Sequence, residues 1–348
     1  MAQNLRRSGQ KGIIMQQGKA SVRFEHPPGI LSAASVAGKK EGEGPLALLF
    51  DEVIQDPFAG KNTWEEAESE FQKRSSQRAI EKAGLSPNHI RYVLAGDLLG
   101  QSIASTFGIM ELNIPFFGLY GACSTMGETL SLGSMLVNAG YGDYVLCVTS
   151  SHFASAEKQF RFPLDYGNQR PYSATWTVTG SGAVILGAQG GKVKVTGVTT
   201  GKIVDFGVRD SMNMGACMAP AAADCIYQNF QDFGVDVGYY DHVITGDLGT
   251  IGQRALIDLL NQKGYDLTKT HMDCGIEIYN SETQDTHAGG SGCGCAAVTL
   301  CSYIVRMLEE GRWNRVLFVP TGALLSPTSF NEGQNIPGIA HGIILEKA

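Results

Sequence analysis

Hydrophobic and polar positions follow one another along the chain in blocks that predict helices and strands in turn. The segment 63–83 has apolar residues at helical spacing, and it opens with Thr63 and Glu66, a capping box. Short apolar runs typical of buried strands lie at residues 92–95, 114–120 and 144–149. Residues 125–138 predict an apolar helix with a single charged residue. Such a helix is expected to be buried nearly all round. Strands and helices in this order predict parallel β-α-β units.

The same order recurs in the second half of the chain. Residues 240–248 resemble residues 90–98, and residues 292–319 repeat the Gly-rich turn, apolar helix and strand of residues 121–149. We therefore expect an α/β fold of two duplicated halves in five layers, α/β/α/β/α, with a pocket where the halves meet. The predicted division is a flexible N-terminus, an N-terminal half and a C-terminal half, at residues 1–20, 21–188 and 189–348.

Composition narrows the range of functions. Of 348 residues, 43% are hydrophobic and 18% are charged, which excludes a disordered chain. The net charge of −7 and the lack of a long basic run argue against nucleic acid as a partner. Eight cysteines are too few for a disulfide scaffold and favour a reducing compartment. We see no membrane span and no signal peptide, so any membrane association is expected to be peripheral.

Cys123 is the strongest candidate for chemistry. It lies between a predicted strand and a helix start, where the helix dipole is expected to lower the thiol pKa. The alternative is a free cysteine that packs as a small hydrophobic side chain. A nucleophilic cysteine needs a base. His287 is the best-placed base because it precedes the helix that mirrors the Cys123 helix, while His152 and His341 beside strand ends are alternatives.

Metal binding and a cationic lid are weaker hypotheses. Cys and His residues between positions 271 and 295 suggest zinc, but their spacing does not match the usual paired ligands. The acidic Gly-rich run 40–44 could suit calcium, but it offers too few ligands by itself. Lys158, Arg161 and Arg170 lie in a charge-poor stretch, either as solvated surface or as a lid that contacts carboxylates.

The segment Gly121-Ala122-Cys123-Ser124 and its helix, with residues 179–186 and 321–324, resemble the thiolase superfamily, closest to β-ketoacyl-ACP synthase III. This resemblance implies a thiolase-like fold and an acyltransferase that uses Cys123. The chain departs from the condensing enzymes at Asp247, where they need a histidine. An anionic carboxylate would oppose an enolate, so we do not expect decarboxylative condensation, although a pair of Cys123 and His287 would survive.

Other blocks resemble the stage V sporulation protein AD family of spore-forming Firmicutes, and they lie at residues 40–46, 95–99, 150–152, 218–224 and 322–327. This resemblance implies non-catalytic binding of dipicolinic acid (pyridine-2,6-dicarboxylate) or its calcium chelate. It also implies that the protein acts together with other stage V sporulation A-operon proteins, which form a membrane channel. The implied role is uptake of dipicolinic acid into developing spores and its release at germination. The expected location is peripheral, on the spore inner membrane. No cofactor is implied beyond calcium carried with the ligand, and a homodimer is an option because the superfamily often forms one.

The candidate ligand-binding residues are Cys123, Ala122, His287, Asp247, Gly322, Ala323, His152 and Arg161. Backbone N–H groups at the Cys123 helix start and in the Gly322 loop are expected to donate to ligand carboxylates, with an arginine. A ligand receptor is favoured over two alternatives. One is a thiolase-type acyltransferase with Cys123 as nucleophile and His287 as base, and the other is a purely structural subunit.

Overall fold

The two halves of the chain build sheets of the same design. The computed structural model describes residues 15–160 and 170–348. The first sheet has the order β3 (Gly29–Gly38), β9 (Gly180–Gly187), β7 (Tyr144–Ser151), β5 (Tyr92–Gly96) and β6 (Phe116–Gly118). The second has the order β10 (Val193–Thr199), β17 (Gly342–Lys347), β14 (Arg315–Val319), β11 (His242–Thr245) and β12 (His271–Asp273).

The strand directions repeat as well as the strand order. In each sheet the first two pairings are antiparallel and the last two are parallel. A short pairing of β3 with β10 joins the two sheets along one path. The duplication predicted from the sequence is therefore confirmed at the level of topology. Shorter strands flank this path: β1 (Gln16–Gln17), β2 (Ser21–Arg23), β4 (Glu52–Ile54), β8 (Trp176–Thr177), β13 (Gly290–Ser291), β15 (Thr321–Ala323) and β16 (Gly338–Ala340).

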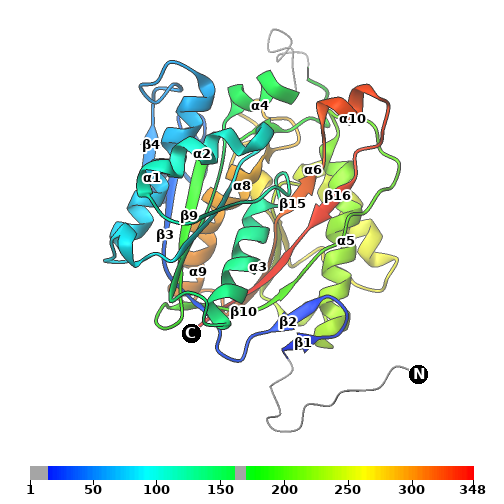
Figure 1. Ribbon diagram of the computed structural model, residues 1–348. Coiled ribbons are helices and arrows are strands. Elements are labelled where there is room, and N and C mark those ends of the chain that lie inside the picture. The colour runs from blue at the N-terminus through cyan, green and yellow to red at the C-terminus, as the bar shows by residue number, and fades with distance from the viewer. Residues whose placement is uncertain (1–14, 161–169) are drawn as a thin grey trace, which may run out of the picture.

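Helices cover both sheets and fill the space between them (Figure 1). The outer face of the first sheet carries α1 (Trp64–Lys82) and α2 (Ile103–Ile109), and that of the second carries α5 (Met214–Phe233) and α6 (Gly249–Asn261). Between the sheets lie α3 (Thr125–Asn138) and the rod of α8 (Cys293–Thr299), a π-helical turn (Leu300–Ile304) and α9 (Val305–Glu309). The five-layer α/β/α/β/α arrangement is confirmed. The remaining helices are short: α4 (Phe153–Phe160), α7 (Cys274–Glu277) and α10 (Pro327–Asn331).

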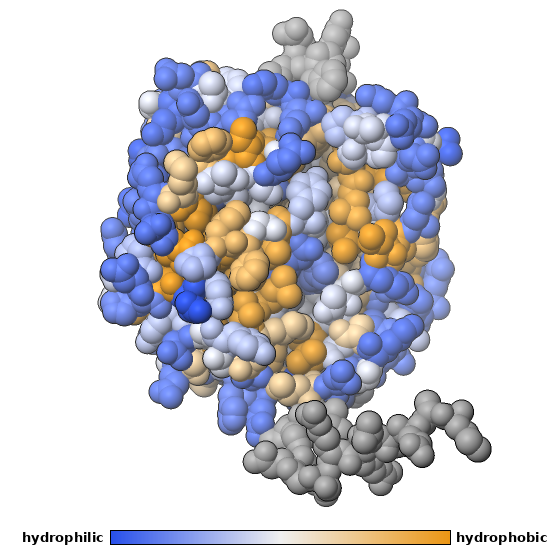
Figure 2. All heavy atoms as spheres, in the orientation of Figure 1, coloured by the Kyte–Doolittle hydropathy of each residue, from blue (hydrophilic) through white to orange (hydrophobic). Residues whose placement is uncertain are grey.

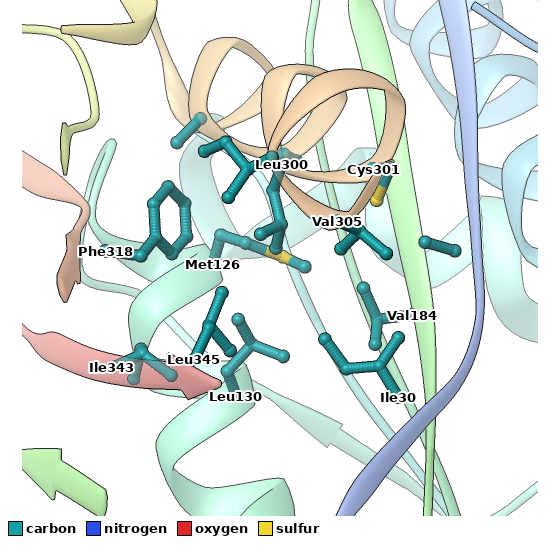
Figure 3. Packing of buried hydrophobic residues seen from close by; sticks show 14 of the residues in the cluster. Ile30, Met126, Leu130, Val184, Leu300, Cys301, Val305, Phe318, Ile343 and Leu345 are labelled. Carbon is teal, nitrogen blue, oxygen red and sulfur yellow. The ribbon is translucent and has the colours of Figure 1, made fainter. Parts of the chain in front are cut away.

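The middle layer is largely buried, as its sequence predicts. Met126 and Leu130 of α3 face Leu300 and Val305 of the neighbouring rod, and all four are buried (Figure 3). Side chains from β17 and from β3 and β9 close this cluster from the two sheets. Because both central helices pack between the two sheets, the loops at their N-terminal ends are fixed relative to each other.

Local predictions hold with three corrections. The capping box of α1 is present, with reciprocal bonds of 3.2 Å between Thr63 and Glu66. The strand expected at residues 114–120 has only the three residues of β6, and the apolar helix at residues 292–308 contains a π-helical turn. Residues 16–20 are not loose, because Asp232 at the end of α5 accepts the Lys19 N–H at 2.8 Å. In the described ranges, no helix is long and apolar enough to cross a membrane.

Candidate functional site

Cys123 and Asp247 meet where the two halves face each other. Cys123 lies in the loop before α3, and Asp247 lies in the loop after β11, the matching strand of the other half. The Cys123 thiol donates a hydrogen bond to the Asp247 carboxyl group. The residue before the cysteine, Ala122, has a left-handed backbone (φ 50°), an uncommon conformation for a residue with a side chain. The duplication thus brings together two candidates that are 124 residues apart in the chain.

Asp247 is buried and held by three donors. Its carboxylate oxygens accept the Gly292 N–H at 2.8 Å and the Thr321 hydroxyl at 2.7 Å, besides the Cys123 thiol. Burial raises the pKa of Asp247 to about 7, against the lowering effect of these three bonds. Asp247 is therefore partly protonated at neutral pH, and the carboxylate expected from the sequence is only partly present.

The Cys123 thiol is protonated at neutral pH, contrary to our expectation. Burial raises the pKa of Cys123 well above its ordinary value, and the nearby Asp247 and Cys293 raise it further. The helix dipole was expected to dominate, but α3 begins at Thr125, two residues after the cysteine. Desolvation of the thiolate outweighs the backbone N–H groups, so the prediction of a lowered pKa is wrong.

His287 is not placed to act as a base for Cys123. Its Nδ1 lies 2.8 Å from the Pro171 carbonyl oxygen, and its Nε2 lies 3.2 Å from the Asp285 carboxylate. Both ring nitrogens are therefore engaged away from Cys123. The predicted pair of Cys123 and His287 is therefore not supported by these contacts.

The other two histidines hold backbone groups. His152 is buried, with Nε2 2.8 Å from the Pro57 carbonyl oxygen and Nδ1 3.1 Å from the Ala154 N–H. The ring of His341 is also buried, its Nδ1 accepts the Gly201 N–H at 3.3 Å, and burial lowers its pKa to about 4. Neither side chain reaches the space beside Cys123, and the placement of His152 as a ligand residue is not supported by these contacts.

The expected cationic lid is not a cluster among the described residues. Lys158 pairs with Glu65 at 2.7 Å, and the buried Arg170 pairs with Asp285 at 3.2 Å. Arg161, a candidate ligand residue, lies outside the described residues.

The Gly322 loop packs directly on the Cys123 loop. A Cβ atom at Gly322 would lie 2.3 Å from the Gly121 carbonyl oxygen and 3.3 Å from the Cys123 nitrogen. Only glycine allows this approach, which explains the residue type at this position. Its neighbour Ala323 is buried and, with Ala122, faces the same space as Cys123.

The space beside Cys123, here called the hollow, is very small. It is lined by Leu98, Tyr120, Ala122, Cys123, Phe160, Thr177, Met214, Ser291, Gly292, Ala323 and Leu325. The volume of the hollow is about 20 Å³, whereas one water molecule needs about 10–15 Å³. Hence the hollow has room for about one water molecule. Asp247 is not among the residues that line the hollow.

A larger space, here called the chamber, adjoins the hollow. It is lined by Leu98, Leu99, Gly100, Gln101, Ser102, Tyr120, Gln159, Phe160, Leu325, Ser326 and Pro327. The volume of the chamber is about 320 Å³, within the range of small-molecule sites. Four residues line both spaces (Leu98, Tyr120, Phe160 and Leu325), so the hollow opens from the chamber.

The chamber wall contains strained backbone. Gln101 and Ser102 are consecutive left-handed residues, with φ of 55° and 51°. Each such residue costs on the order of 1–3 kcal/mol, and strain of this kind concentrates at binding sites. Asp97 compensates by accepting the Leu99 N–H at 2.9 Å and the Ser105 N–H at 2.8 Å on either side of the strained pair.

The acidic run 40–44 joins the halves and does not form a cation site. The Glu41 carboxylate is buried and accepts bonds from the Thr179 N–H and the Tyr279 hydroxyl. Lys40 and Gln284 exchange bonds between side chain and backbone in both directions. Across the described part of the chain, no group of three or more His, Cys, Asp or Glu side chains could hold a metal ion.

Comparisons with known proteins decide the family. A family model described as "Stage V sporulation protein AD (SpoVAD)" matches residues 18–346. The chain belongs to this family. A curated relative, the stage V sporulation protein AD of Bacillus subtilis (strain 168), is 44% identical over 331 residues, covering 95% of this chain and 98% of the relative.

Solved structures confirm the thiolase-like fold of this SpoVAD family member. The 3-oxoacyl-[acyl-carrier-protein] synthase III of Aquifex aeolicus is 13% identical with a TM-score of 0.58, over 92% of this chain and 99% of that chain. A tetronic acid condensing enzyme, AbyA1, is 17% identical with a TM-score of 0.59, over the same shares. Xanthomonas campestris OleA is 12% identical with a TM-score of 0.57, over 93% of this chain and 99% of that chain. At these identities the likeness concerns the fold alone.

Most of the chamber residues were missed in the sequence analysis. The block at residues 95–99 marked the family resemblance, but nothing in it indicated that Leu98 and Leu99 line a site. Gln101 and Gln159 are exposed polar residues of unremarkable pattern. Only the fold, which brings the loop after β5, helix α4 and the loop before α10 together, identifies them.

Proposed function

We propose that this chain is a non-catalytic receptor for the calcium chelate of dipicolinic acid and holds that ligand in the chamber. The observation that carries this proposal is the contrast between the two adjoining spaces. The hollow contains a protonated thiol and room for about one water molecule, while the chamber has the volume of a small-molecule site and no charged side chain among its described lining residues. The membership of the chain in a sporulation protein family agrees with a spore-specific ligand.

Acyl transfer at Cys123 is disfavoured by three features together. The thiol is protonated, the residue bonded to it is a carboxyl group, and the histidine expected as its base faces other partners. A thiolate formed beside the Asp247 carboxylate would also meet a like charge in a buried setting. A cysteine accepts an acyl group poorly when no base takes its proton and nothing stabilises its thiolate.

The chelate is favoured over the free dianion by the chamber's lack of charge. Among its described lining residues no side chain is charged, and the polar groups are amides and hydroxyls, as on Gln101, Gln159 and Ser326. Bringing an uncompensated dianion into such a space is costly, whereas calcium bound to the ligand carboxylates makes it neutral. The apolar walls at Leu99 and Leu325 suit the faces of an aromatic ring.

Titration calorimetry tests this proposal. We expect heat with equimolar calcium and dipicolinate, at least tenfold weaker binding with dipicolinate in a chelator, and none with calcium alone. Ser326→Trp fills the chamber and should abolish binding, while Thr328→Trp, two residues later on the short helix α10 and outside the lining, should not. No heat with either ligand form contradicts the function. Tighter binding of the free acid contradicts the chelate, and unchanged binding in Ser326→Trp contradicts the chamber as the location.

We also propose that the chain works at the spore inner membrane with the other stage V sporulation A-operon proteins, and that it associates with a second copy of itself. Among the described strands, the end strand β6 pairs with β5 alone, and its Phe117 side chain is 49% exposed. Phe107 on α2 (55% exposed) and Leu132 on α3 (42% exposed) are further exposed apolar side chains. Figure 2 shows orange apolar patches among polar residues on one face of the molecule. An exposed apolar edge strand favours pairing with another chain.

A further inference from the structure

A buried carboxyl group holds the first wall of the chamber. Asp97 lies at the start of the loop that carries Leu98 to Ser102, and it is fully buried. Besides the two backbone bonds that flank the strained pair, its Oδ2 accepts the Ser105 hydroxyl at 2.6 Å. The conformation of this wall therefore depends on an acceptor at Asp97.

A second buried carboxyl group holds the opposite wall. Glu68 on α1 accepts the Ser155 hydroxyl at 2.6 Å and the Ser150 hydroxyl at 3.1 Å. Ser155 belongs to α4, the helix whose last two residues, Gln159 and Phe160, line the chamber. Glu68 thus ties α4 to α1 and to β7.

One amide joins the two carboxyl groups into a single network. Gln72 Nε2 lies 3.1 Å from the Ser105 hydroxyl, which is bonded to Asp97, and 3.2 Å from the Ser150 hydroxyl, which is bonded to Glu68. The whole network is inaccessible to solvent. A change at one carboxyl group is consequently felt at the other through these shared partners.

Among the described residues, the charges around the network do not include a cation that neutralises it. The titratable groups that face Glu68 and Asp97 are Glu65 on α1, the Cys293 thiol and the Tyr120 hydroxyl. On α4, Lys158 is paired with Glu65 at the surface. Beside α4, the His152 ring is bonded to backbone groups. Burial and the nearby Asp97 together raise the pKa of Glu68 to about 8, and burial also raises the pKa of Asp97.

We propose that Glu68 and Asp97 are positioning residues that hold both walls of the chamber closed through one buried proton, so that ligand affinity falls when this proton is lost. The effect on ligand affinity rests on the proposed function. The closure of the two walls by Glu68 and Asp97, here called the latch, does not. When both groups are ionised in the same network, they repel each other, and no described side chain supplies a counter-charge. Opening lets water reach them, at the expense of the bonds to Ser105 and Ser155.

The sign of the pH effect follows from linkage. In an open chamber Glu68 is hydrated and ionises near its ordinary value of 4.5, whereas in the closed chamber it ionises near 8. The closed form is therefore favoured at low pH. The ratio of closed to open chambers falls by up to about tenfold per pH unit between these two pKa values. Above about pH 8 the glutamate is ionised in both forms, and the dependence levels off.

Hydrogen exchange of the full chain tests the latch without any ligand. In the wild type, protection of residues 97–105 and 153–160, corrected for intrinsic exchange, should fall by up to about tenfold per pH unit from pH 5.5 and level off near pH 8. Glu68→Gln keeps a neutral side chain of the same shape and should remove this slope. Ser76→Ala is the matched control, because this buried α1 hydroxyl has no bond and the slope should stay.

A second variant keeps both carboxyl groups. Ser155→Ala removes a bond that lowers the pKa of Glu68, so the levelling-off should move to higher pH. A slope in Glu68→Gln equal to that of the wild type, no slope in the wild type, or no shift in Ser155→Ala would each overturn the latch. Calorimetry with the calcium chelate over the same pH range should show the wild-type affinity following the protection. If the slopes behave as expected but no chelate binds, the latch stands and the proposed function fails.

Discussion

Replacing Asp247 with asparagine tests whether this buried carboxyl group carries a proton in the folded protein. Asparagine keeps the size of the side chain, and its oxygen can accept the Gly292 N–H as the carboxylate does. Its NH₂ group then faces Thr321, whose hydroxyl can turn and accept a hydrogen bond instead of donating one. We therefore expect Asp247→Asn to fold, with a fixed loss of about 1–2 kcal/mol from poorer bonding.

The magnitude of the pH effect comes from the raised pKa. Burial raises the pKa of Asp247 from 3.8 to about 7. As the pH rises between these values, the unfolded chain releases this proton while the folded chain keeps it, so the free energy of unfolding falls. A difference of about three pH units corresponds to about 4 kcal/mol, which is the upper limit of this contribution. Above pH 7 the contribution is constant.

Urea unfolding from pH 4.5 to 8, with intrinsic fluorescence as the probe, measures this contribution as a difference. Other buried acids titrate in the same range, but they are present in both proteins and cancel in the comparison. The free energy of unfolding of the wild type should fall relative to that of Asp247→Asn until about pH 7 and then run parallel to it. A difference that does not change with pH would refute the reasoning, because Asp247 would then be ionised in the folded chain.

Three further predictions concern the surroundings of the site. Gly322→Val places a Cβ atom 2.3 Å from a carbonyl oxygen of the Cys123 loop and should lower the free energy of unfolding by about 1–3 kcal/mol; Gly238→Val, whose Cβ would have no neighbour nearer than 3.4 Å, should not. Phe117→Lys should shift sedimentation toward the monomer, whereas Leu48→Lys at a site 97% exposed elsewhere should not. Cys123 should stay unmodified by acetyl-CoA in intact mass spectra at pH 7.5, because its thiol is protonated; an acyl adduct would contradict this.

The repeated architecture could be predicted because each element has its own local pattern. The helix of residues 125–138 carries a single charge and is apolar on most of its faces, which is typical of a helix between two covering layers, and the structure has it there. The matching segment at residues 292–308 has the same character, so the two helices were expected to share the central layer. Local pattern and duplication together were sufficient for the five-layer fold.

The properties of Cys123 could not be predicted in the same way. A position near a helix start can be read from the chain, but the solvent around that position cannot. The effect of the helix and the effect of burial have opposite signs on a thiol pKa, and burial is set by residues far away in sequence, such as Met214 and Ala323. The position of His287 depends on the path of an irregular loop, which has no periodic pattern to read.

The replacement at position 247 links these observations. Both halves end a strand at the same place, so whatever side chain follows β11 lies against Cys123. A histidine there would stabilise a thiolate and exchange protons with it, whereas a carboxyl group opposes the thiolate by like charge and accepts its proton in a hydrogen bond. The proton on Cys123 is thus a consequence of Asp247 as well as of burial, and both effects act in the same direction. A carboxyl group at this one position therefore disfavours a thiolate at Cys123, whereas the described lining of the chamber beside it carries no charged side chain.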